Sequence, residues 1–215
     1  MTKKHEWRKH EKALYLPKAK PQIIEVPELK YISIKGEGSP DDPLFGKCIE
    51  ALYSLAYTIK MTLKKIDHPP KDYCDFTVYP LEGVWSLNDE AIKRFTGTID
   101  KNDLLYKLML RQPNFISDEF FKEMLEVVIQ KTIKQKKSTQ KLTELKFETI
   151  NEGKCIQMLH VGKFANEAHT FNIMQEFAKE NNLSRESKYH REVYLSDFRK
   201  VEEDKLKTVL RFKCK

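Results

Sequence analysis

Residues 43–66, PLFGKCIEALYSLAYTIKMTLKKI, give the strongest structural signal in this chain of 215 residues. Apolar side chains recur there at the spacing of an α-helix that buries one face. The segment ends at His68-Pro69-Pro70, because proline cannot continue a helix. We therefore expect a long amphipathic helix. Its apolar positions are Leu44, Ile49, Leu52, Leu55, Ala56, Ile59 and Leu63.

Extended segments flank this helix on both sides. Residues 30–35 alternate as a strand does, and residues 104–110 are expected to form another strand. Residues 76–85 are also extended, with Pro80 and Gly83 marking a bulge or bend. The order strand, helix, strand, strand is thus expected over residues 30–111.

The second half of the chain repeats this order after a helix expected at 118–136. Residues 145–149 and 155–160 flank Asn151-Glu152-Gly153, a short loop whose glycine suits a bulged hairpin. Strand, helix, strand and strand are therefore expected again over residues 154–213. The later elements of this set are a helix at 170–178 and strands at 189–196 and 205–213.

The expected fold class is α+β, with pseudo-duplicated strand-helix-strand-strand units. Such units build one antiparallel sheet with helices on one face and leave the other face free. Residues 1–28 are expected to be an irregular N-terminal arm, because Pro17, Pro21 and Pro27 interrupt any helix. Residues 29–215 then form the domain itself.

Lysine and arginine number 39 against 32 aspartate and glutamate residues, so a nucleic-acid partner has to be considered. The densest basic run, residues 131–141, ends an expected helix, where lysines complement the helix dipole. The sequence contains no helix-turn-helix pattern and no RNA-binding aromatic signature. We favour solvated charge and expect no nucleic-acid partner, with a basic nucleic-acid binder as the competing class.

The cysteines, the N-terminus and the apolar runs indicate the cellular compartment in which the protein is expected. Cys48, Cys74, Cys155 and Cys214 stand singly, without CxxC or zinc spacing, and the N-terminus lacks a secretory apolar stretch. These features are typical of reduced thiols in the cytoplasm. No apolar run approaches the ~20 residues of a membrane helix, so no membrane partner is expected. The histidines form no HExxH or other metal spacing, so we expect neither a metal nor a cofactor.

One short segment has the residue pattern that best indicates a ligand-binding or catalytic site. It is His190-Arg191-Glu192-Val193-Tyr194-Leu195-Ser196. In a strand, His190, Glu192 and Tyr194 share one face, while Val193 and Leu195 share the other and pack against helices. Glu192 and Tyr194 then occupy the uncovered face. A carboxylate among aromatic rings suits a planar or cationic organic ligand, because rings supply stacking and the charge fixes orientation. The alternative is an exposed face on which Glu192 is only solvated.

Aromatic and acidic residues also surround the expected bend at residues 80–83. Tyr79, Glu82 and Trp85 would suit one wall of a pocket. Trp85 is equally well explained as an anchor of the core. Serine-based acyl hydrolysis is disfavoured, because the sequence lacks a G-x-S-x-G elbow.

Four ordered stretches of this sequence resemble the GyrI-like small-molecule-binding family, which includes the drug-binding domains of multidrug-responsive transcription regulators. The resemblance covers about residues 30–213. The stretches are 78–85 (VYPLEGVW), 108–115 (LMLRQPNF), 157–162 (QMLHVG) and 192–197 (EVYLSD).

This resemblance implies a pseudo-duplicated α+β sheet with a ligand groove between its two halves. It also implies that Glu192 lies at the ligand, where Trp85 and Tyr194 belong to an aromatic cage. Tyr79 and Glu82 are further expected ligand-binding residues. His190 shares the strand face of Glu192 and is expected at the ligand as well.

The chain looks like a stand-alone member of the family, because no helix-turn-helix precedes the domain. Long stand-alone members form a subfamily described as cyclopropanoid cyclopropyl hydrolases, which open the strained ring of DNA-alkylating drugs such as yatakemycin. The resemblance thus implies detoxification of hydrophobic, planar drugs. Glu192 would orient or deprotonate the attacking water, and Tyr194 would stack on the drug or bond the developing phenolate. The alternative is a protein that binds, sequesters or senses such compounds without chemistry.

Overall fold

Six strands and seven α-helices form in the computed structural model, which describes residues 4–94 and 100–215. Every strand pair whose register is defined there is antiparallel, and the predicted α+β class is confirmed. The chain divides into two units. The first comprises Met1–His5, Leu29–Tyr79 and Leu87–Ile150, and the second comprises Glu6–Glu28, Pro80–Ser86 and Asn151–Lys215.

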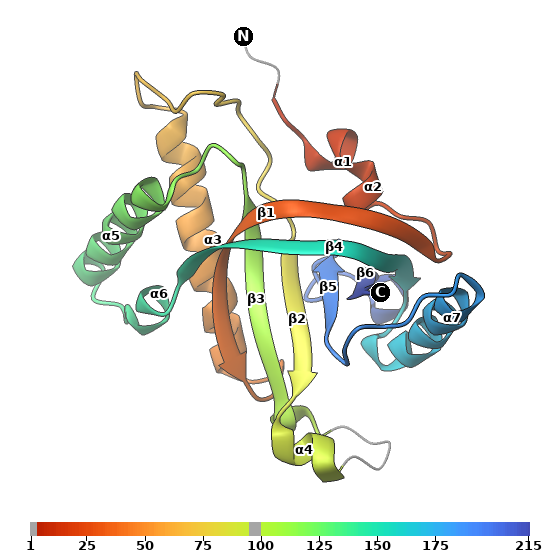
Figure 1. The fold of residues 1–215 in the computed structure, drawn as a ribbon. Coiled ribbons are helices and arrows are strands. Elements are labelled where there is room, and N and C mark those ends of the chain that lie inside the picture. Colours follow the sequence, from red (N-terminus) through yellow and green to blue (C-terminus); the bar gives the residue numbers. More distant parts are fainter. Residues whose placement is uncertain (1–3, 95–99) are drawn as a thin grey trace. The chain divides into compact units, whose positions relative to one another are not determined.

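The first unit is built around the long helix α3 (Pro43–Leu63), as the sequence predicts. Asp42 caps this helix by accepting a hydrogen bond from the backbone N–H of Leu44 at 2.7 Å. Helix α3 packs against strand β3 and against two further helices (Figure 1). Strand β3 itself pairs with residues 30–37 of β1. The elements of this unit are residues 29–37 of β1 (Gln22–Glu37), α4 (Asp89–Arg94), a 3-10 turn (Lys101–Asp103), β3 (Leu104–Gln112), α5 (Asp118–Lys134) and α6 (Gln140–Thr143).

The second unit contains an antiparallel sheet in the order β2-β5-β6-β4. Helix α7 (Glu167–Glu180) packs on one face of this sheet, where Met174 and Ala178 join Leu210 and Phe212 in a buried apolar cluster (Figure 1). The strands are residues 81–86 of β2 (Leu81–Leu87), residues 151–161 of β4 (Lys146–Val161), β5 (His190–Tyr194) and β6 (Lys207–Lys213), and 3-10 turns form at Phe164–Asn166 and Glu203–Lys205. Among the helices of residues 4–94 and 100–215, none has the length and apolar character needed to cross a membrane.

The N-terminal segment departs from the predicted irregular arm. Residues 7–15 form the short helices α1 (Trp7–His10) and α2 (Lys12–Tyr15), and β1 begins at Gln22. The buried rings of Trp7 and Tyr15 have their centroids 5.3 Å apart, so the segment contributes to the core. Pro17 and Pro21 fall between α2 and β1, which is why they do not prevent either helix.

The predicted hairpin around residues 151–153 is also wrong, because the chain continues through it as the single strand β4. Gly153 has φ +65°, a conformation that glycine adopts at no steric cost. It deforms the strand without reversing it. The elements otherwise follow the expected order, with β1, α3, β2 and β3 before β4, α7, β5 and β6. The duplication itself stays a prediction.

A buried charge network joins the strands of the second unit. Arg191 donates from Nη1 to Glu82 Oε2 at 2.6 Å and from Nε to Glu152 Oε1 at 2.9 Å. Arg211 donates to Glu152 Oε2 at 3.2 Å and to Gln157 Oε1 at 2.9 Å. Its Nη2 also donates to the backbone carbonyl of Leu14 at 2.8 Å, and this hydrogen bond connects α2 to the network. Because strand residues alternate, the network lies on the sheet face opposite α7.

We expect Glu152→Gln to destabilise the protein near neutral pH by about 3–5 kcal/mol, because it removes the carboxylate that two buried guanidinium groups share. Burial raises the pKa of Glu152, but Arg191 and Arg211 outweigh burial and hold that pKa below its ordinary value of 4.5. The stabilisation is therefore complete above about pH 4.5 and is lost as the pH falls through the lowered pKa.

Urea unfolding of the native chain and the variant, at about pH 7 and about pH 3, measures this effect, and the gap between them should shrink at the lower pH. Glu203→Gln is the control, because Glu203 pairs with Lys163 at an exposed site and its loss should cost less than about 1 kcal/mol. An equal gap at both pH values would contradict the assignment.

Candidate functional site

The pairing of β2 with β5 gathers several of the predicted site residues on one face of the second unit's sheet. Gly83 lies opposite Glu192, and Trp85 lies opposite His190. Directly paired residues of antiparallel strands share a face, and so do residues two apart on one strand. Trp85, His190, Glu192 and Tyr194 therefore lie together. With Glu167 of α7, they form what we call the Glu192 cluster.

Hydrogen bonds link the members of this cluster. Trp85 donates from Nε1 to the Tyr194 hydroxyl at 2.7 Å. Tyr194 in turn bonds Glu192, and burial together with that neighbouring carboxylate raises the pKa of the phenol well above 10.0. On the other side, His190 Nε2 lies 2.9 Å from Glu192 Oε1. Glu192 is only 7 % exposed, so the alternative of a merely solvated side chain is excluded.

Glu167 is the member of the cluster that sequence analysis missed. It stands in the first turn of α7, which begins three residues before the predicted helix, and it is 9 % exposed. Burial raises its pKa well above 4.5, and the charge of Glu192 and a hydrogen bond to it act in the same direction. The raised pKa favours the protonated form of Glu167 beside Glu192. Its position, an acid at the start of an amphipathic segment, is the one sequence signal that could have identified Glu167 as a site residue.

The Glu192 face of the sheet is not uncovered, contrary to expectation. Val193 points away from it and is fully buried, but α7 lies on the Glu192 side and supplies Glu167. The reason is the apolar pattern of β6, whose Leu210 pairs with Glu192 and packs under Met174 of α7. Glu192 is therefore enclosed between the sheet and this helix.

Gly83 makes room for the contact between Trp85 and Tyr194. A Cβ atom there would lie 2.8 Å from Trp85 Nε1 and 2.9 Å from the Tyr194 hydroxyl, too close for either. The register of β2 with β5 runs without interruption from Glu82 to Trp85, so the bulge predicted at Gly83 is absent. Glycine is needed here for close approach of side chains and not for a turn.

Two further rings adjoin the cluster. Phe164 meets Tyr194 edge to face, with ring centroids 6.2 Å apart, and is 40 % exposed. Phe171 meets His190 in the same way at 4.8 Å. Edge-to-face contacts of this kind are favourable and fix ring orientation. The aromatic surroundings of Glu192 thus include α7 and the turn before it, which the sequence did not indicate.

Two predicted site residues lie outside the cluster. Glu82 points to the opposite face of β2 and is held by Arg191 in the buried charge network. Tyr79 belongs to the first unit, where the Arg111 guanidinium carbon lies 4.5 Å from the centre of its ring. Both are buried, at 1 % and 3 % exposure. The structure therefore brings together Trp85, His190, Glu192 and Tyr194 of the predicted set.

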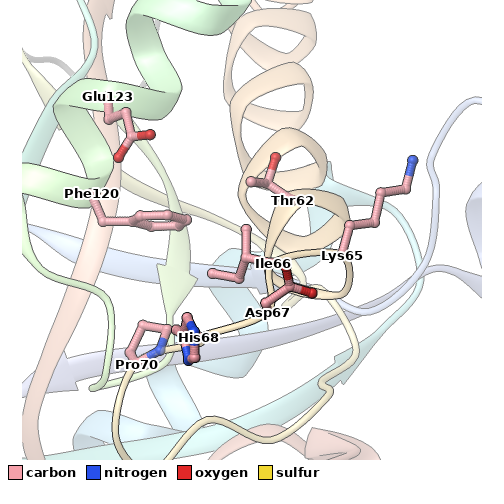
Figure 2. A pocket seen from close by; sticks show the side chains of 8 residues that line it. All are labelled: Thr62, Lys65, Ile66, Asp67, His68, Pro70, Phe120 and Glu123. Carbon is pink, nitrogen blue, oxygen red and sulfur yellow. The ribbon is translucent and has the colours of Figure 1, made fainter.

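A separate hollow of about 630 Å³ lies in the first unit, beside the C-terminal end of α3. Figure 2 shows the Phe120 ring and Ile66 facing each other across it, while the Lys65 amine points away. Its acids and its histidine show no hydrogen-bonded pair, in contrast to the Glu192 cluster. The lining residues are Thr62, Lys65, Ile66, Asp67, His68, Pro70, Phe120 and Glu123.

Comparison with known proteins supports a family assignment. A family model described as the GyrI-like small molecule binding domain matches residues 19–214. The crystal structure of an uncharacterized conserved protein from Listeria innocua is similar with a TM-score of 0.85 at 36% identity, covering 98% of this chain and 100% of that one. No match was found among curated proteins.

Two further crystal structures from Listeria innocua are each described as a hydrolase. One has a TM-score of 0.84 at 34% identity and covers 98% of this chain, and the other has 0.86 at 36% identity and covers 99%. Each of those chains is covered over 100% of its length. With the domain model spanning nearly the whole sequence, this chain belongs to the GyrI-like small-molecule-binding domain family.

Proposed function

We propose that this chain binds hydrophobic, planar small molecules at the Glu192 cluster and hydrolyses the cyclopropane ring of DNA-alkylating cyclopropanoid drugs. The observation that carries the proposal is a nearly buried carboxylate, Glu192, bonded to Tyr194 and flanked by aromatic rings. Membership of a small-molecule-binding family supports the ligand class. Relatives at 34% and 36% identity that are described as hydrolases support the reaction type.

The substrate determines what the site has to supply. Its cyclopropane is conjugated to a dienone, so attack of water on a ring carbon forms a C–O bond and breaks a strained C–C bond. The electron pair of the broken bond moves to the dienone oxygen, which becomes a phenolate. The proton lost by the water balances the proton that the phenolate gains. Positioning, one base and one hydrogen-bond donor are sufficient for this reaction.

The Glu192 cluster offers these functions. Glu192 accepts the proton of the attacking water, while His190 and Tyr194 fix the orientation of its carboxylate. The Tyr194 hydroxyl, which Trp85 holds and which bonds Glu192 in the resting site, turns its O–H to the developing phenolate as Glu192 takes up the proton of water. The exposed ring of Phe164 adds an apolar surface for a flat ligand beside Tyr194.

Binding without turnover is the second candidate function. It is favoured by the number of side chains that already engage Glu192, because a carboxylate bonded to Tyr194, His190 and Glu167 must give up one of these contacts before it can accept a proton from water. Incubating the chain with a yatakemycin-type drug and following the ring-opened, hydrated product by mass spectrometry separates the two. Binding with no product would leave the sequestering function.

We expect Glu192→Gln to reduce turnover at least about a hundredfold, because the amide cannot accept the proton of water. Affinity for a neutral ligand should change little, since glutamine keeps the shape and can still bond Tyr194. Product formation by mass spectrometry and quenching of tryptophan fluorescence measure the two quantities separately. Glu180→Gln, at an exposed position of α7, is the matched control. Turnover that survives in Glu192→Gln would show that Glu192 is not the base.

We expect Tyr194→Phe to lower kcat by about a hundredfold and to alter KM much less, because the ring is kept while the donor to the phenolate is removed. Tyr189→Phe is the control, since Tyr189 lies on the same segment but is 56 % exposed. Steady-state kinetics of the two variants test the assignment. Equal kcat values for both would remove Tyr194 from the mechanism.

A further inference from the structure

We propose that Glu167, His190 and Glu192 form a binding site for a divalent first-row transition metal ion, for which Zn²⁺ is a suitable probe. The three residues come from α7 and β5 of the second unit and stand 23 and 25 positions apart from Glu167, which is why no sequence motif revealed them. The proposal goes beyond hydrolysis and does not depend on it.

Geometry is the first argument. One ligand atom from each residue can be chosen so that all three lie within 4.8 Å of one another. Metal–oxygen and metal–nitrogen bonds of about 2.0–2.2 Å place the ligands of one ion at most about 4.4 Å apart. In the tetrahedral geometry that zinc prefers, these bond lengths set the ligand atoms about 3.3–3.6 Å apart. Side-chain rotation that closes the widest pair by about an ångström would bring the three atoms onto one ion.

The second argument is an unpartnered oxygen. Glu167 is only 9 % exposed, and its Oε1 is buried and has no hydrogen-bond partner. A buried carboxylate oxygen without a partner is costly, and native proteins rarely keep one unless an ion or water satisfies it. A carboxylate oxygen of Glu167 lies within 4.8 Å of ligand atoms of His190 and Glu192, so this carboxyl group can turn its unpartnered oxygen to a cation held there.

The third argument is charge. Within residues 4–94 and 100–215, neither Glu167 nor Glu192 pairs with a lysine or arginine, and His190 is the one basic side chain at hydrogen-bond distance from Glu192. The Arg191 guanidinium points to the opposite face and is occupied by Glu82 and Glu152. When both carboxyl groups are ionised, no lysine or arginine of the described residues balances their charge, and a divalent ion can take that place.

The donor set selects the class of metal. Imidazole nitrogen suits zinc and its neighbours in the first transition row, and carboxylate oxygens complete their coordination. Three protein ligands leave at least one position for water, as in open zinc sites. The edge of the Phe171 ring, with its centroid 4.8 Å from that of His190, holds the imidazole in place.

Metal binding and hydrolysis use the same carboxylate, so they are separable by experiment. Zn²⁺ that engages Glu192 withdraws it from water activation, and we expect added Zn²⁺ to inhibit turnover. Hydrolysis assayed in EDTA therefore tests the proposed function by itself, and metal titration tests the site by itself.

Isothermal titration of the EDTA-treated, dialysed full chain with Zn²⁺ should give one saturable site. Glu167→Gln and His190→Gln should each weaken binding by at least about tenfold, whereas His169→Gln, an exposed histidine of the same helix, should not. Titration with Co²⁺ adds a direct readout, since coordination by nitrogen and oxygen gives visible absorption that Glu167→Gln should abolish.

The absence of saturable Zn²⁺ uptake by the native chain would overturn the site. Equal affinity in Glu167→Gln, His190→Gln and His169→Gln would overturn it too, because the ion would then lie elsewhere. Should His190→Gln fail to fold, as judged by thermal unfolding, the Co²⁺ spectra of the native chain and Glu167→Gln decide the question.

Discussion

Strand β5 buries a charged side chain on each of its two faces, and the organisation of the second unit depends on how these charges are satisfied. Placing an ion in an apolar interior is unfavourable unless it is paired or hydrogen-bonded. On one face, Arg191 is 3 % exposed and lies between two carboxylates, Glu82 and Glu152. On the other face, Glu192 is 7 % exposed and is met by Tyr194, His190 and Glu167, whose pKa is raised by burial.

The two faces of β5 therefore differ in how completely their charged groups are hydrogen-bonded. The network around Arg191 is closed, because each guanidinium reaches acids or carbonyls in fixed geometry, and its natural role is to hold the strands in register. The Glu192 cluster keeps two adjacent carboxyl groups and an unpartnered oxygen on Glu167. Binding sites in proteins are commonly supported in this way: groups that can still bond a ligand lie beside residues that complete hydrogen bonding holds rigid.

Local patterns predicted local structure well. The spacing of apolar residues identified α3, and the alternation in residues 190–194 correctly grouped His190, Glu192 and Tyr194 on one face. The failures share a cause, which is that one local signal fits two tertiary outcomes. Gly153 suits a hairpin loop, yet the same positive φ occurs within the continuous strand β4. Prolines near the N-terminus excluded a long helix but not the two short ones, α1 and α2.

Periodicities of two and 3.6 residues along the chain were enough to predict the α+β class, helix α3 and the strand face that Glu192 shares with Tyr194. Tertiary structure alone decided which elements lie against that face. It brought Glu167 to Glu192, turned Glu82 away to Arg191 and placed Gly83 beneath the Trp85–Tyr194 bond. Such meetings depend on strand register and helix packing between distant segments, and no local pattern encodes them.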